Sequence, residues 1–184
     1  MRWIWLDRFV DFQRGRSARA VKNLSLAEDH FTEHFPGYPV MPAPLMLEGL
    51  AQTGGILVGE VNDFREKVVL AKIPMARFTR EVLAGEQLIY DVEILHMRPE
   101  GASVRGRVLV GEEVVAEAEI FFAHLDQARS QQLFGDHNFV FSGELKKMLG
   151  LAQLQGARNQ GSGVRDQESG VNKNAGASSL TPDS

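Results

Sequence analysis

One long helical segment stands among periodic stretches that otherwise alternate in the manner of β-strands. Residues 44–61 are apolar around nearly the whole helical circumference, which is typical of a helix enclosed by other elements. Gly49, Gly54, Gly55 and Gly59 within it each cost about 1 kcal/mol relative to alanine in a helix interior. We therefore expect a buried helix whose glycines let a sheet approach closely.

Strand-like alternation precedes and follows this helix. Before it, the pattern predicts strands over residues 3–12 and 17–23. After it, strands are expected over residues 68–82, 87–98, 102–110 and 113–124. Two short strands, one helix and a run of strands imply an α+β fold in which an antiparallel sheet packs against a single central helix.

Composition divides the 184-residue chain into three parts. Residues 1–125 carry the periodic pattern and are expected to form the folded domain. Residues 126–155 are expected to form an extension that contains one short helix. Leu145 and Met148 would share one face of this helix. Residues 156–184 contain no aromatic side chain and too little apolar surface to offset the entropy of ordering, so a disordered tail is expected.

Charge and composition exclude several classes of function. The formal net charge of −4 argues against a non-specific nucleic-acid binder. The absence of cysteine excludes disulfides, zinc–thiolate sites, iron–sulfur clusters and cysteine nucleophiles. The longest apolar segment, residues 41–58, contains Glu48 and Gln52 and is too polar for a membrane span of about 20 apolar residues. We expect a cytoplasmic protein without a membrane span.

Glu48 lies in the otherwise apolar sequence LMLEGLAQ of the predicted helix. A carboxylate in such a setting is costly unless it is paired, and costly ionisable groups cluster at functional sites. Pro44 suits the first helical turn, which places Glu48 about 6 Å from the helix start, where the helix dipole favours a carboxylate. Gln52 lies one turn further on the same face and is expected to hold Glu48 in place. The alternative is a structural glutamate with a backbone or arginine partner.

His34 opens the loop HFPGYPVMPAP, which contains four of the chain's seven prolines and is therefore stiff. A rigid loop is a good mount for a catalytic group, although a structural histidine is the alternative. Ten extended residues span about 30 Å, so His34 and Glu48 of one chain need not meet. A site shared between two subunits is then an alternative. The spacing of His30 and His34 also fits a metal pair, but no third ligand is evident nearby.

The segment from His34 to Gln52 resembles the bacterial (3R)-hydroxyacyl-[acyl-carrier-protein] dehydratases of the FabZ type. The chain reads HFPGYPVMP where the family has HFPGxPVMPG, and LEGLAQ where the family has IEALAQ. The resemblance extends over about residues 1–125 through LDR at 6–8, ARF at 76–78, AGEQL at 84–88 and VAEA at 115–118.

The resemblance implies a hot-dog fold, in which an antiparallel sheet wraps around one long central helix. It also implies a homodimer with two active sites at its interface, and leaves a trimer of dimers open. The implied reaction removes water from a (3R)-3-hydroxyacyl thioester of acyl carrier protein and gives the trans-2-enoyl thioester, with no metal or organic cofactor. His34 would be the base, Glu48 of the other subunit the acid, and the Ala43 N–H the donor to the thioester carbonyl, with Gln52 and Gly37 in support.

An acyl substrate needs an apolar tunnel, and an acidic carrier protein needs a basic patch on an acidic enzyme. The tunnel candidates are Leu45, Leu47, Ile56, Met75 and Phe78. The candidates for carrier-protein contact are Arg77, Arg80 and Arg98, and a solvated charged face is the alternative interpretation.

The chain departs from the family pattern at three positions. Ala43 and Pro44 stand where the family has Gly-Val, and Glu81 stands where it has proline. Ala43 restricts the backbone and Pro44 removes an N–H near the thioester. Two other functions therefore stay open: a dehydratase of a polyketide or specialised lipid pathway, and a non-catalytic hot-dog module that binds acyl chains or carrier protein. A thioesterase fits the motifs less well.

Overall fold

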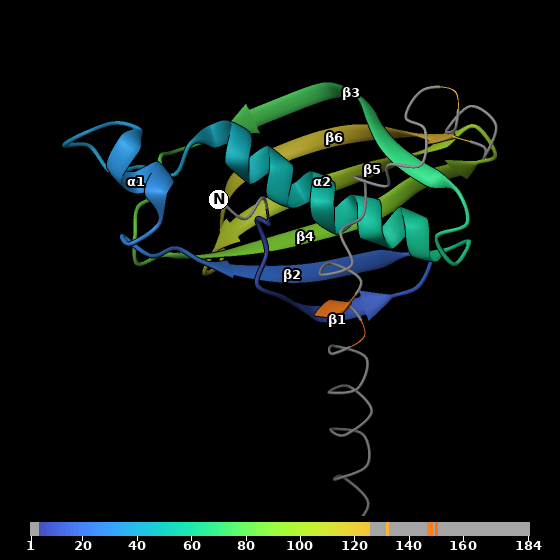
Figure 1. Ribbon diagram of the computed structural model, residues 1–184, viewed down its shortest axis with the longest axis horizontal. Coiled ribbons are helices and arrows are strands. Elements are labelled where there is room, and N and C mark those ends of the chain that lie inside the picture. The colour runs from blue at the N-terminus through green and yellow to red at the C-terminus, as the bar shows by residue number, and fades with distance from the viewer. Residues whose placement is uncertain (1–3, 126–131, 133–146, 149, 151–184) are drawn as a thin grey trace, which may run out of the picture.

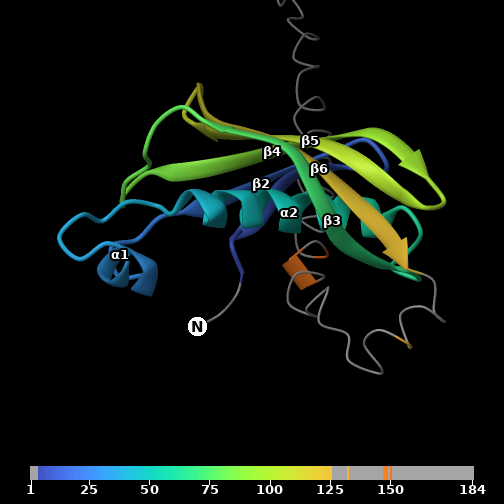
Figure 2. The ribbon, with the colours of Figure 1, turned by 90° about the horizontal axis from the view of Figure 1, so that it is seen from above.

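The computed structural model describes residues 4–125 together with Gln132, Lys147, Met148 and Gly150. Six strands form one antiparallel sheet in the order β1-β2-β4-β5-β6-β3. Their bounds are Arg8–Gln13 (β1), Ser17–Asn23 (β2), Lys67–Phe78 (β3), Gln87–Arg98 (β4), Gly101–Val110 (β5) and Glu113–Leu125 (β6). The helices are α1 (Asp29–Glu33) and α2 (Ala43–Glu60). Because α2 lies along one face of the curved sheet (Figures 1 and 2), the expected α+β hot-dog arrangement is confirmed.

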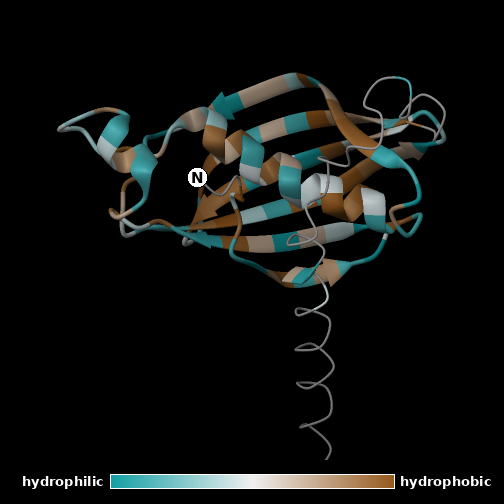
Figure 3. Ribbon diagram, in the orientation of Figure 1, coloured by the Kyte–Doolittle hydropathy of each residue, from teal (hydrophilic) through white to brown (hydrophobic). Residues whose placement is uncertain are grey.

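The strand and helix bounds agree closely with the periodicity of the sequence. β2 and β4 have the predicted bounds. β5 and β6 differ from theirs by one residue at one end, and α2 is shifted by one residue at both ends. Hydrophilic and hydrophobic residues alternate along the strands (Figure 3). The buried face of β4 carries Leu88, Tyr90 and Val92, which belong to the same core cluster as Leu50 of α2. Alternation therefore identified the side of the sheet that faces the helix.

Three elements differ from the predictions. β1 begins at Arg8 rather than residue 3, because Trp5 and Leu6 are buried by packing in the core without pairing in the sheet. β3 ends at Phe78 rather than residue 82, since the Val82 carbonyl accepts a hydrogen bond from Met41 N–H in another loop, at 2.7 Å. The short helix α1 had no clear periodic signal, because it is only five residues long.

The number of glycines in α2 predicted a close approach of the sheet, and the packing confirms it. A methyl group at Gly49 would lie 2.1 Å from the ring of Tyr90, and one at Gly54 would lie 3.1 Å from Phe122. On the opposing strand β5, a methyl group at Gly106 would lie 2.8 Å from Leu50. The helix and the sheet thus touch through positions that have no side chain.

Of the C-terminal extension, Met148 packs against the core, and the neighbouring Lys147 and Gly150 are also helical. The other residues of the predicted extension helix and of the predicted tail lie outside the described residues. Neither α1 nor α2 is long and apolar enough to cross a membrane.

Candidate active site

The loop that begins at His34 is held in a defined shape by backbone hydrogen bonds. Gly37 has a φ of +79°, a backbone conformation that glycine adopts without steric cost. The N–H of Tyr38 donates to the Phe35 carbonyl at 2.9 Å, which closes a tight turn directly after His34. The glycine of the motif therefore sets the direction in which the loop leaves His34.

The same loop is fastened to the segment that follows β3. Val40 forms an isolated antiparallel bridge with Leu83. The Tyr38 hydroxyl donates to the Glu81 carboxylate, and this hydrogen bond raises the pKa of Tyr38. Glu81, a departure from the family pattern, thus contacts the loop that carries His34.

A cavity of about 440 Å³ lies between this loop, the start of α2 and the end of β3. His34, which is exposed, lines it from the loop, and Ala43 lines it from the first residue of α2. Phe78, a tunnel candidate, lines the opposite side together with Arg80. The structure therefore brings together a histidine, the N-terminus of a helix and an apolar side chain.

Glu48 occupies a different surface, one turn inside α2. It is half-buried rather than fully enclosed, and the residues that line the His34 cavity do not include it. The Gln52 side-chain amide donates to Glu48 Oε1 at 2.9 Å, the contact that their spacing predicts. The N–H of Trp5 in turn donates to Gln52 Oε1 at 2.9 Å.

The remaining tunnel candidates are not among the residues that line the His34 cavity. Leu45 and Leu47 are half-buried on α2, and Met75 is half-buried on β3. Ile56 is fully enclosed in the core, where it packs as an ordinary core side chain. Tunnel-lining and core residues have the same apolar character, so the sequence could not separate them.

The three arginine candidates also differ. The Arg80 guanidinium bonds both carboxylate oxygens of Glu86, at 2.9 and 3.2 Å, and also Glu113 at 2.9 Å. These hydrogen bonds raise the pKa of Arg80 and neutralise its charge locally. Arg77 and Arg98 are exposed on β3 and β4. Arg80 therefore anchors the segment beside the His34 cavity.

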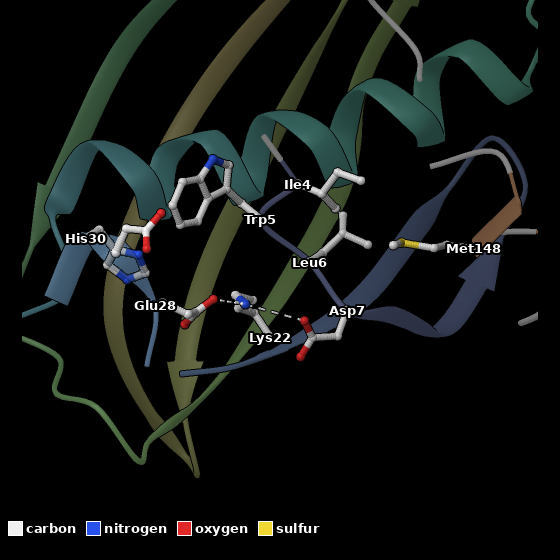
Figure 4. A pocket seen from close by; sticks show the side chains of 9 residues that line it. Ile4, Trp5, Leu6, Asp7, Lys22, Glu28, His30 and Met148 are labelled. Atoms are coloured by element: carbon white, nitrogen blue, oxygen red, sulfur yellow. Dashed lines mark hydrogen bonds and ion pairs between the residues drawn. The ribbon is translucent and has the colours of Figure 1, made fainter. Parts of the chain in front are cut away.

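A second cavity, of about 400 Å³, lies beside the N-terminal segment (Figure 4). Lys22, almost wholly buried, forms ion pairs there with Glu28 and with Asp7 (3.5 Å for Asp7). The His30 ring packs edge-on against Trp5 with 5.2 Å between ring centroids, and burial lowers the pKa of His30. Sequence reasoning assigned nothing to Lys22, because its partners lie in other segments.

The spacing of His30 and His34 is also compatible with a shared metal ion. Within the described part of the chain, no three histidine, aspartate or glutamate side chains gather in a way that could hold a metal ion. His30 is buried against aromatic rings, whereas His34 is exposed at its cavity.

Comparison with known proteins places this chain in a family. The model of the FabA-like domain matches residues 3–119. The 3-hydroxyacyl-[acyl-carrier-protein] dehydratase FabZ of Pelotomaculum thermopropionicum is 42% identical over 122 residues, which cover 66% of this chain and 87% of that protein. The enzyme of the same description from Oceanobacillus iheyensis is 43% identical over 122 residues, with the same two shares. The chain therefore belongs to the FabA-like family, and the relatives that it matches at this identity are of the FabZ type.

A solved structure agrees with this fold. The dehydratase heterocomplex ApeI:P from Xenorhabdus doucetiae superposes with a TM-score of 0.55 at 14% sequence identity. The match covers 73% of this chain and 91% of that one. At this identity the likeness concerns the fold alone.

Proposed function

We propose that this protein is a hydro-lyase that removes water from (3R)-3-hydroxyacyl thioesters of acyl carrier protein in fatty-acid biosynthesis and releases the trans-2-enoyl thioester. One observation carries the proposal: His34 and the N-terminus of α2 line one cavity in a chain 42–43% identical to FabZ dehydratases. The expected surroundings are the cytoplasm, and the reaction requires no metal or organic cofactor.

The cavity supplies two of the three groups that the elimination needs. The C2 proton is weakly acidic, so a base must remove it while a donor stabilises the charge that develops on the thioester oxygen. His34 is the proposed base. The Ala43 N–H, at the first residue of α2, is the proposed donor, because first-turn N–H groups have no partner within their own helix. Pro44 cannot add a second donor.

The third group is the acid, and Glu48 is proposed to supply it from the other subunit of a homodimer. Glu48 lies outside the cavity that His34 lines, which supports a site built from two chains. In the elimination, His34 takes the C2 proton, the C3–O bond breaks, and the hydroxyl leaves as water with the proton of Glu48. Proton exchange with solvent then restores neutral His34 and protonated Glu48.

The edge of the sheet offers a surface for this homodimer. β3 is a 12-residue edge strand, and its side chains Leu70 and Phe78 are 44% and 38% exposed. A long edge with exposed apolar side chains is a template for pairing with another chain. We propose that β3 pairs with its counterpart in a second copy. Measuring the molecular mass in solution distinguishes a dimer from a trimer of dimers.

The acidic carrier protein is proposed to dock on a patch at Arg77, the residue before Phe78 of the His34 cavity. Arg98 is a separate candidate, because it lies at the other end of the sheet, beside Val61 and His124. Arg80 contributes less to this patch, because its guanidinium is already bound to Glu86 and Glu113. Gly37 and Gln52 keep supporting roles, since Gly37 shapes the His34 loop and Gln52 contacts Glu48.

The direct test is turnover. Purified protein is incubated with 3-hydroxybutyryl and longer 3-hydroxyacyl carrier proteins, and enoyl thioester is followed by absorbance. His34→Ala and Glu48→Gln should each lower kcat by about 100-fold or more, the usual loss for a general acid or base. Carrier-protein binding without turnover in the unaltered chain would instead favour the non-catalytic module that Ala43 and Pro44 suggest. A substrate panel separates fatty-acid intermediates from those of specialised lipid pathways.

A further inference from the structure

Two hydrogen bonds join the N-terminal segment to Glu48 through a single side chain. The backbone N–H of Trp5 donates to Gln52 Oε1 at 2.9 Å. The Gln52 Nε2 donates to Glu48 Oε1, also at 2.9 Å. Both hydrogen bonds are partly buried, which strengthens them relative to bonds in open solvent.

The chemistry of the groups fixes the direction of both bonds. A backbone N–H can only donate, so the end of the Gln52 amide that faces Trp5 must be its carbonyl oxygen. The NH₂ end then faces Glu48 and must donate to it. If the amide were turned over, two donors would face each other at Trp5 and a buried N–H would lose its partner. Glu48 Oε1 is therefore always an acceptor.

We propose that the N-terminal segment, acting through Gln52, determines which oxygen of Glu48 carries the acid proton. Oε1 accepts from Gln52, so the proton resides on Oε2, and Oε2 is the oxygen presented to the leaving hydroxyl. Gln52 and the Trp5 backbone are positioning residues in this scheme. The inference rests on the proposed role of Glu48 as the acid and deepens it.

The segment that supplies the Trp5 N–H is itself firmly held. The Trp5 ring is buried against His30, and the next residue, Leu6, is buried in the core. Asp7 N–H donates to the Val21 carbonyl at 2.7 Å, which ties the segment to the second strand. Figure 4 shows these side chains around the second cavity. A donor on such a segment keeps its direction when the substrate enters.

The charged side chains of Asp7, Lys22 and Glu28, which lie near this segment, pair with one another: Asp7 and Glu28 are both paired with Lys22. Asp7 additionally accepts from the N–H and the side-chain amide of Asn23, at 2.8 and 3.0 Å. Among the residues that the structure describes, the N-terminal segment is thus joined to Glu48 by the neutral Gln52 amide.

Two variants of Gln52 test the proposal by kinetics. Gln52→Met keeps the length of the side chain and removes both bonds. The carboxylate that forms as Glu48 gives up its proton then lacks one hydrogen bond, so kcat should fall about tenfold with KM within about twofold. Gln52→Glu places two carboxyl groups side by side, which share one proton, so the limb of the pH–kcat profile that reports the acid should move to higher pH. An unchanged kcat in Gln52→Met or an unmoved profile in Gln52→Glu would overturn the inference.

A matched control and a readout other than activity separate this inference from the proposed function. Gln87→Met removes a hydrogen bond of the same kind, to Asn23 at 2.7 Å on the exposed sheet, and should leave kcat unchanged. Hydrogen exchange at the Trp5 amide should be slow in the unaltered protein and fast in Gln52→Met. If the unaltered protein lacks dehydratase activity but shows this protection, the proposed function fails and the fixed amide stands. A Trp5 amide that exchanges equally fast in both proteins contradicts the inference, whatever the activity.

Discussion

His30 shows how a single buried group couples stability to pH. Its pKa is lowered chiefly by burial; Lys22 lowers it further, whereas Glu28 and Asp29 oppose the shift. The unfolded chain therefore binds a proton near the ordinary histidine value of 6.5, whereas the folded chain binds it only at lower pH. The contribution of neutral His30 to stability is present above that value and is lost as the pH falls through 6.5 toward the folded pKa.

We predict that the free energy of unfolding falls between about pH 7.5 and about pH 5.5, and that His30→Gln weakens this dependence. Urea unfolding at several pH values measures it. His96→Gln, at an exposed position on β4, is the control and should leave the slope unchanged. An identical slope in His30→Gln and the unaltered protein would show that other groups cause the dependence.

Single residues also show how much of the candidate site the sequence predicted. The contact between Gln52 and Glu48 followed from helical spacing, because residues four apart share a face. The Trp5 N–H that holds Gln52 is 47 residues away, and backbone donors leave no trace in residue type. The partners of Lys22 could not be assigned for a different reason: charged side chains are common, and three segments must fold before these meet.

Among the elements, α2 depends most strictly on its sequence. Gly49→Ala would bring a methyl group within 2.1 Å of the Tyr90 ring, which is wholly buried and cannot move away freely. The substitution should destabilise the protein by about 3 kcal/mol or more, although alanine is worth about 1 kcal/mol over glycine in an unconstrained helix. Denaturant unfolding monitored by circular dichroism measures the loss.

Gly54→Ala is the matched comparison, because its methyl group would lie at 3.1 Å from Phe122 and needs only a small shift. We expect a clearly smaller loss for Gly54→Ala than for Gly49→Ala. Equal losses would mean that glycine flexibility, rather than contact with the sheet, determines the tolerance of α2. The number of glycines indicated a close approach of the sheet, but only the packing shows that Gly49 leaves less room for a methyl group than Gly54.

The loop elements were the hardest to place from the sequence. Periodicity located β2 and β4 because a sheet buries every second residue. It carried β3 past its true end, because Val82 is apolar, yet its carbonyl accepts a hydrogen bond from Met41 N–H after the His34 loop and Val82 does not pair with β6. The proline-rich loop has no hydrophobic periodicity. Its hydrogen bond to Glu81 and its bridge to Leu83 are tertiary contacts, so the sequence could not predict them.

At the scale of the whole molecule, the separation of His34 and Glu48 makes a prediction about mixed assemblies. If each site takes His34 from one subunit and Glu48 from the other, a dimer of His34→Ala with Glu48→Gln has one site in which both residues are intact. Random mixing makes half of the dimers of this kind, so activity should recover to about a quarter of the unaltered level, as symmetry of a two-fold dimer requires. Each variant alone should remain nearly inactive.

The experiment needs subunit exchange, which brief partial denaturation and refolding of the mixed variants provides. Enoyl thioester formation before and after exchange is the measurement, and size-exclusion chromatography with light scattering confirms that dimers have re-formed. A mixture of His34→Ala with unaltered protein controls for losses on refolding. No recovery after demonstrated exchange would place both residues of each site in the same chain, and the loop from His34 to α2 would then have to bring them together when substrate binds.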